Sequence, residues 1–146
     1  MLQFQYKTKH ILAISDTHGY HRSLSIPESD ILIHCGDACS NGNEEELMDF
    51  FSWFSILPAK KKIFIAGNHD LIFDLDPGEA LHRMPKNVIY LADSGCTIGG
   101  IRFHGLQARP WLYEMPPTPS RTVDILLTHG PAYSCLLYTS PSPRDI

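Results

Sequence analysis

The sequence has few cysteines and no closely spaced cysteine pair. Its four cysteines are unevenly spread along 146 residues, and the C-x-x-C spacing does not occur. Without that spacing, neither a disulfide framework nor a structural zinc site is expected. We expect the thiols to be free and buried.

Long apolar runs are also absent. Residues 1–9 mix polar and aromatic side chains, and no stretch reaches the length of a signal-peptide core or of a membrane span. We therefore expect an intracellular, cytoplasmic protein that does not enter a membrane.

An excess of basic charge is missing as well. The formal net charge is -4, and the basic residues are scattered apart from a run of three lysines at residues 60–62, which we expect to be a solvated entry to a strand. No electrostatic track for nucleic acid is visible, so nucleic acid is not indicated as a partner. The composition, 43% hydrophobic and 19% charged, is that of a folded domain, and the length suits one core rather than two.

Short apolar runs rich in β-branched residues predict strands, and each run ends in polar residues. These runs are residues 10–15, 30–35, 62–66, 88–91, 101–104 and 123–128. Helical spacing of apolar residues predicts a helix over residues 43–57 and a shorter one from Pro77 to about Met84. The alternation of strand and helix predicts an α/β fold with a partly parallel sheet. Four prolines within residues 107–120 predict a long surface loop.

Side chains that can hold a metal follow four of the predicted strands. They are Asp16 and His18, then Asp37, then Asn68 with His69 and Asp70, and finally His129. Active-site groups of open α/β sheets collect at the carboxyl ends of strands, so we expect these clusters to meet. In an extended segment Asp16 and His18 would point the same way and grip one ion together. Asp, Asn and His are ligands of hard to borderline divalent metals.

The order D-x-H, G-D, G-N-H-D and H-G resembles the calcineurin-like metallophosphoesterase superfamily, over roughly residues 11–131. Residues 67–73, with Pro110 and Trp111, resemble the subgroup of metallophosphoesterase-domain-containing brain proteins. The resemblance implies a metallophosphoesterase-type αββα sandwich, incomplete at its C-terminus in this chain. It also implies a metal-dependent hydrolase of phosphate monoesters or diesters that uses two divalent ions, Mn, Fe or Zn, and hydroxide held on them.

The resemblance assigns a role to each clustered residue. It implies that Asp16 and His18 bind the first metal, that Asp37 bridges, and that Asn68 and His129 bind the second. His69 would protonate the leaving alkoxide or stabilise charge on the phosphoryl group, and Asp70 would hold the His69 ring.

Two further residues flank the proline-rich loop. His104 and Arg109 lie on the way out of a predicted strand, where they would either contact the phosphate-ester substrate or be solvated. The pair His34 and Cys35 mimics the start of the cysteine-phosphatase loop H-C-x5-R, but position 41 is Asn and no arginine grips the phosphate. We expect His34 to be a satisfied core or sheet-surface histidine rather than a functional residue.

The chain departs from the family pattern at its end, where no G-H-x-H follows His129. Residues 135–145 correspond to codons that match a transposase sequencing adapter. We therefore expect residues 1–134 to form a truncated metallophosphoesterase domain and residues 135–146 to be an unpacked, non-native tail. The alternative is a catalytically weak or inactive scaffold protein with this fold. Every ligand before the break is present, which favours truncation over decay.

Overall fold

The computed structural model describes residues 1–108, 119 and 122–129. Arg109 and the predicted tail at residues 135–146 lie outside these residues. The described strands are β1 (Leu2–Tyr6), β2 (Lys9–Ile14), β3 (Ser29–His34), β4 (Ala59–Phe64), β5 (Val88–Tyr90), β6 (Ser94–Ile98), β7 (Ile101–Gly105) and β8 (Ile125–Leu127). The described helices are the short 3-10 helix η1 (His21–Ser23), α1 (Glu44–Ser55), α2 (Ile72–Leu75) and α3 (Pro77–Arg83).

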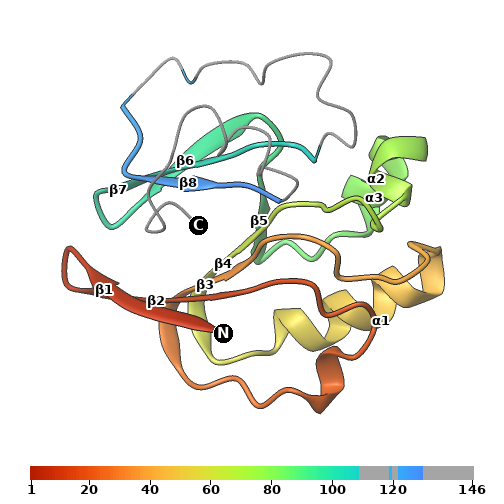
Figure 1. Cartoon of the computed structure of the whole chain (residues 1–146), viewed down its shortest axis with the longest axis horizontal. Coiled ribbons are helices and arrows are strands. Elements are labelled where there is room, and N and C mark those ends of the chain that lie inside the picture. Colours follow the sequence, from red (N-terminus) through yellow and green to blue (C-terminus); the bar gives the residue numbers. More distant parts are fainter. Residues whose placement is uncertain (109–118, 120–121, 130–146) are drawn as a thin grey trace, which may run out of the picture.

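The strands form two sheets (Figure 1). The first has the order β1-β2-β3-β4-β5, in which β1 runs antiparallel to β2 and the other neighbours are parallel. The second has the order β6-β7-β8, with β6 antiparallel and β8 parallel to β7. The α/β class and the partly parallel sheet are thereby confirmed.

The central strands β2 and β3 each contain a continuous apolar stretch because both of their faces are covered. In β3, Ile31 and Ile33 pack toward the second sheet with Phe103 and Leu127. Leu32 belongs to the other core, on the helix side, where it packs with the aromatic residues of α1. This arrangement follows from the two-residue period of a strand, which sends successive side chains to opposite faces.

Helix α1 begins where the sequence supplies a cap. The Asn43 side chain accepts the backbone N–H of Glu46, and three glutamates occupy the first turn, where the helix dipole favours negative charge. Its apolar face carries Phe50 and Phe54, both fully buried. Helix α3 begins with Pro77 after the capping Asp76.

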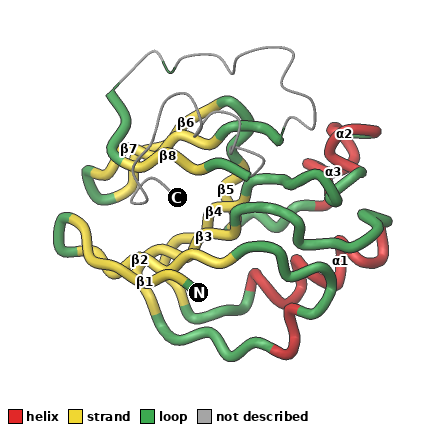
Figure 2. The backbone as a smooth tube through the Cα atoms, viewed as in Figure 1, coloured by secondary structure: helices red, strands yellow, loops and turns green. Residues whose placement is uncertain are grey.

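The layers are helices, first sheet and second sheet (Figures 1 and 2). They correspond to three layers of the predicted αββα sandwich, and within the described ranges no helix covers the outer face of the second sheet. No helix in the described part of the chain combines the length and the apolar character that crossing a membrane requires.

The structure corrects the expectation for Lys62 and confirms the one for His34. Lys62 is not solvated: it is 5% exposed, and its Nζ donates to Ser55 O at 2.9 Å, at the carboxyl end of α1. The apolar stem of the side chain is buried while the charged end reaches a helix carbonyl. His34 is a buried core histidine, as expected, with Nε2 3.1 Å from Thr17 Oγ1.

Candidate metal centre

Three of the predicted ligands meet at the carboxyl edge of the two sheets. Asp16 follows β2, Asp37 follows β3 and His129 follows β8. One ligand atom from each lies within 4.8 Å of the others. Asp37 is buried and Asp16 is exposed, so the cluster is reached from solvent on one side. Two carboxylates and an imidazole at these separations form a donor set for a divalent cation.

His18 lies beside the same cluster. Its Nε2 is 3.7 Å from Asp16 Oδ1 and 3.8 Å from Asp37 Oδ2. These separations are too long for hydrogen bonds. They suit ligands that share an ion, since bonds of about 2.0 to 2.2 Å place two donors roughly 3 to 4 Å apart.

Asn68 supplies an oxygen that has no partner. Its Oδ1 is buried and accepts no hydrogen bond in the described structure. A buried amide oxygen without a donor is costly, and coordination to a cation would satisfy it. The donor set of carboxylate, imidazole and amide oxygen therefore fits the divalent metals that the sequence predicts.

The backbone at three of these residues is left-handed. The φ angles are 56° at Asp16, 44° at His18 and 57° at Asp37. Our expectation that Asp16 and His18 lie in an extended segment is therefore wrong, because β2 ends at Ile14. Hydrogen bonds hold the turn: Asp16 N–H donates to Gly36 O at 2.9 Å, and His18 N–H donates to Asp37 O at 3.0 Å.

Two glycines let the loops approach closely. A Cβ on Gly36 would lie 2.8 Å from His129 Nδ1 and 2.7 Å from the backbone nitrogen of Gly67. A Cβ on Gly67 would collide with the carboxylate of Asp37. Gly36 also has a φ of 99°, which few other residues adopt. Substitution at either glycine would push the loops that carry the cluster apart.

His129 is oriented by two contacts. Its Nδ1 is 2.8 Å from the carbonyl oxygen of Cys35 and donates to it, so Nε2 faces Asp37 Oδ2 at 3.2 Å. Burial lowers the pKa of His129, but the hydrogen bonds to Asp37 and Cys35 outweigh burial and raise this pKa to about 8. For Asp37, burial raises the pKa, and the bonds from His129 and from the backbone N–H of His69 outweigh it, so the pKa lies below its usual value.

The Asp70 side chain has a different structural role from the one that we expected. It is 1% exposed, and its carboxylate accepts four backbone N–H groups. The donors are those of Asp37, Ala38, Cys39 and Gly67, at 2.8 to 3.3 Å. The prediction that Asp70 holds the His69 ring is wrong, because this carboxylate is taken up by the loop after β3 and the loop after β4. Asp70 joins the two loops that carry Asp37 and Asn68.

The His69 ring is held by a main-chain group instead. Its Nδ1 is 3.0 Å from Ser40 O, and its ring centroid is 5.2 Å from that of His18 in an edge-to-face arrangement. The ring is exposed and lies next to the cluster. The sequence did not reveal this contact, since any residue at position 40 supplies a carbonyl.

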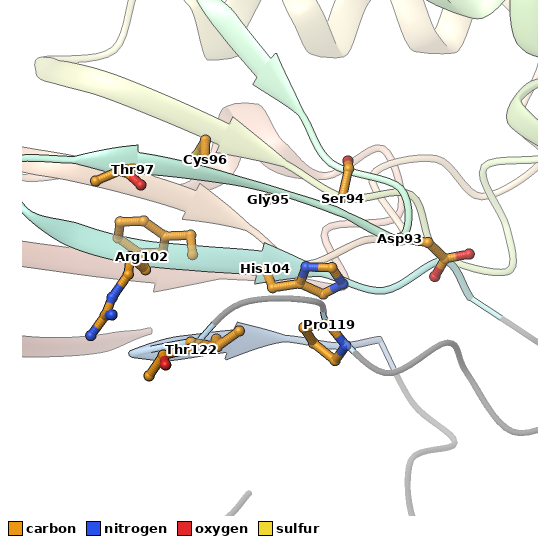
Figure 3. A pocket seen from close by; sticks show the side chains of 11 residues that line it. Asp93, Ser94, Gly95, Cys96, Thr97, Arg102, His104, Pro119 and Thr122 are labelled. Carbon is orange, nitrogen blue, oxygen red and sulfur yellow. The ribbon is translucent and has the colours of Figure 1, made fainter.

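His104 lies in a separate cavity of about 150 Å³. Figure 3 shows its ring on β7 next to Pro119, with Arg102 and Thr122 further along the same cavity. The Nε2 of His104 is buried and has no partner in the described structure. None of the five predicted metal ligands lines this cavity. Substrate contact by His104 stays a prediction, and Arg109 lies outside the described residues.

The described site defines an α/β protein with a candidate divalent-metal centre at the carboxyl edge of two sheets. A sequence model of the Calcineurin-like phosphoesterase family matches residues 9–145, and the chain belongs to that family. This membership supports a metal-dependent phosphoesterase function in general.

Curated relatives agree with this family. The chain is 36% identical over 146 residues to UPF0046 protein K07C11.7 of Caenorhabditis elegans, covering 83% of this chain and 50% of the relative. It is 34% identical over 155 residues to the human Metallophosphoesterase domain-containing protein 1, covering 82% of this chain and 48% of the relative. The chain spans about half the length of these relatives.

Proposed function

We propose that the full-length gene product hydrolyses phosphate monoesters or diesters with a dinuclear divalent-metal centre. The observation that carries this proposal is the convergence of Asp16, Asp37 and His129 within 4.8 Å at the ends of three strands. Membership of the Calcineurin-like phosphoesterase family supports the reaction class.

The site residues divide into metal ligands and a residue that acts on the substrate. Asp16 and His18 would hold one ion, Asn68 and His129 the other, and Asp37 would bridge them. When bound, such ions lower the pKa of water and neutralise charge on the phosphate. The Oδ2 of Asp37 lies near both His18 and His129, in keeping with a bridging carboxylate.

His69 would act on the leaving group. Ser40 O accepts the proton of Nδ1, so Nε2 is the ring nitrogen left to exchange a proton with the substrate oxygen. A positioned general acid contributes typically about 10²- to 10⁴-fold to the rate. The contribution grows as the leaving group becomes more basic, since an unactivated alkoxide needs the proton more.

The test compares two variants of the full-length gene product with phenyl and 4-nitrophenyl phosphate esters. D37A should lose both metal, measured by elemental analysis, and activity. H69A should keep its metal and lose about 10²-fold or more in kcat for the phenyl ester, with a smaller loss for the activated one. The matched control is D76N. Asp76 caps α3 and is not one of the predicted site residues, and Asn can replace it as the cap. Loss of metal in H69A would contradict this division of roles.

A catalytically weak or inactive scaffold protein with this fold is the alternative to the enzyme. Reading the source DNA past codon 134 separates the two. A G-H-x-H some tens of residues beyond His129 supports the enzyme. A native locus that continues with the present codons 135–146, together with a metal-free and inactive protein, supports the scaffold.

A further inference from the structure

Glu46 binds the backbone of the loop before α1. Its Oε2 accepts the N–H and the hydroxyl of Ser40, at 2.7 and 2.8 Å. Its Oε1 accepts the N–H groups of Asn41 and Gly42, at 2.9 and 3.0 Å. One carboxylate therefore accepts hydrogen bonds from three consecutive backbone N–H groups. This arrangement is that of an anion-binding nest in which the bound anion is a side chain of the protein itself. We call residues 40–42 the Ser40 loop.

The Ser40 loop contacts the segment that carries His69 at two points. The carbonyl of Ser40 accepts a hydrogen bond from His69 Nδ1 at 3.0 Å. Gly42 has a φ of 72° and packs against that segment so closely that a Cβ there would lie 2.6 Å from His69 O. A shift of the loop would therefore move both the partner of the His69 ring and its backbone support.

The Ser40 carbonyl also decides which His69 nitrogen carries the proton. A carbonyl oxygen only accepts, so Nδ1 must be protonated while the contact lasts. If the loop swings away, the ring can rotate and exchange tautomers, so the nitrogen that carries the proton is no longer fixed. Glu46 therefore affects the protonation of the His69 nitrogens through the Ser40 loop alone.

We propose that Glu46 is a positioning residue for His69, acting through the Ser40 loop. This proposal rests on the role of His69 in the proposed function. Among the three glutamates in the first turn of α1, only Glu46 makes these loop contacts in the described structure.

The ionised state of Glu46 suits this position. Burial raises the pKa of its carboxyl group, but the backbone N–H groups of the Ser40 loop outweigh burial and leave the pKa below its usual value. Gly19 completes the surroundings, since a Cβ there would lie 3.0 Å from Glu46 Oε2. The half-buried carboxylate therefore lies between two loops that reach the candidate metal centre.

The test is a double-mutant cycle in the full-length gene product, with the phenyl phosphate ester as substrate. E46A should lower kcat about 10-fold, because the His69 ring loses its fixed position, while KM changes less than 2-fold. In the H69A background the same change should cost less than 2-fold, since no ring remains to be positioned. The matched control is E45A, which removes an equal charge from the same helical turn at an exposed site.

A readout independent of activity is the tautomer of the His69 ring, given by the resonances of its two ring nitrogens detected through the carbon-bound ring protons in NMR spectra. The Nδ1-protonated form should dominate in the native protein and in E45A, and a mixture of tautomers should appear in E46A. If E46A does not fold, E46Q takes its place, because its amide presents donors to the donors of the loop and disturbs the same contacts.

The outcomes distinguish failure of the positioning role of Glu46 from failure of the proposed phosphoesterase function. Equal losses in both backgrounds, or an unchanged His69 tautomer in E46A and E46Q, would overturn the positioning role while leaving the phosphoesterase intact. If the native protein hydrolyses no phosphate ester with any metal, the proposed function fails. The NMR comparison then still decides whether Glu46 positions the ring.

Discussion

Individual residues of the candidate centre occupy backbone conformations that most side chains avoid. Asp16, His18 and Asp37 all have positive φ, a region that costs non-glycine residues roughly 1 to 2 kcal/mol each. Backbone hydrogen bonds to Gly36 O and Asp37 O hold the turn at Asp16 and His18. In the loop after β3, Asp70 accepts the N–H groups of Asp37, Ala38 and Cys39. Strain of this kind gathers where a fold must aim side chains at one point, and here it gathers around the predicted ligands.

We predict that D70N destabilises the protein strongly. Asn keeps the shape of Asp, but its NH₂ group would face backbone donors, leaving at least one buried N–H without an acceptor. Each such group costs about 1 to 3 kcal/mol, and loss of charge weakens the remaining bonds, so we expect a loss of about 2 to 4 kcal/mol in the free energy of unfolding. Urea denaturation measures it.

The control for D70N is D76N, because Asn caps a helix about as well as Asp and position 76 is exposed. D76N should change the free energy of unfolding by less than about 0.5 kcal/mol. A D70N protein as stable as the native one would show that the four contacts to Asp70 contribute little.

At the scale of elements, the apolar runs predicted most of the fold. β2, β3, β5, β7 and β8 overlap the predicted strands, and β4 begins three residues before its predicted start. β1 was not among the predicted strands, although Leu2, Phe4 and Tyr6 alternate with two glutamines there. β6 contains glycine, cysteine and threonine, so its sequence gives a weak apolar pattern.

Less of the candidate site than of the fold could be predicted from the sequence. Residues that bear chemistry stand out by type and position, which is how sequence alone suggested Asp16, Asp37 and His129. Contacts made through the main chain do not stand out, so the partners of His69 and Asp70 required the structure. A carbonyl or an N–H group is present at nearly every position, and only the fold decides which of them meet.

The β1–β2 hairpin has an unfavourable turn, and we predict that T8G stabilises it. Tyr6 pairs with Lys9, so Lys7 and Thr8 form a two-residue turn, with φ of 48° and 67°. This geometry is that of a type I′ turn, which favours glycine at its second central position. A β-branched residue is strained there, so T8G should raise the free energy of unfolding by about 1 kcal/mol.

The matched control is T97G, which puts glycine in the exposed middle of β6. It should lower the free energy of unfolding by about 0.5 to 1 kcal/mol. The two variants are compared by urea midpoint at unchanged slope. If T8G lowers the midpoint as T97G does, the turn is not strained.

For the molecule as a whole, the two sheets enclose one of the two apolar cores, and a polar cluster closes its edge. The turn between β1 and β2 and the turn between β6 and β7 lie on the same side of the molecule (Figure 2). Lys7 Nζ donates to Gly100 O at 3.2 Å. Asp124, which precedes β8, accepts the Tyr6 hydroxyl at 3.2 Å and pairs with Arg102 on β7 at 3.0 Å. The first sheet is thereby tied to the second at the edge opposite the metal ligands.

This edge cluster gives the last prediction, which concerns acid. The hydrogen bonds from the Arg102 side chain and backbone hold the pKa of Asp124 well below its usual value. In the unfolded chain an aspartate titrates near its ordinary pKa of about 3.9. Below that pH the unfolded state binds the proton first, so the stabilisation by Asp124 is present above about pH 4 and is lost as the pH falls toward the lowered pKa.

We therefore expect D124N to be less stable than the native protein by a constant amount between pH 5 and 7, and the difference to shrink steadily below pH 4. R102Q should show the same convergence, and D124N with R102Q should cost less than the sum of the two, because both remove one interaction. Thermal unfolding between pH 2 and pH 7 measures all four proteins. A difference that persists unchanged to pH 2 would mean that Asp124 acts through its shape and packing rather than its charge.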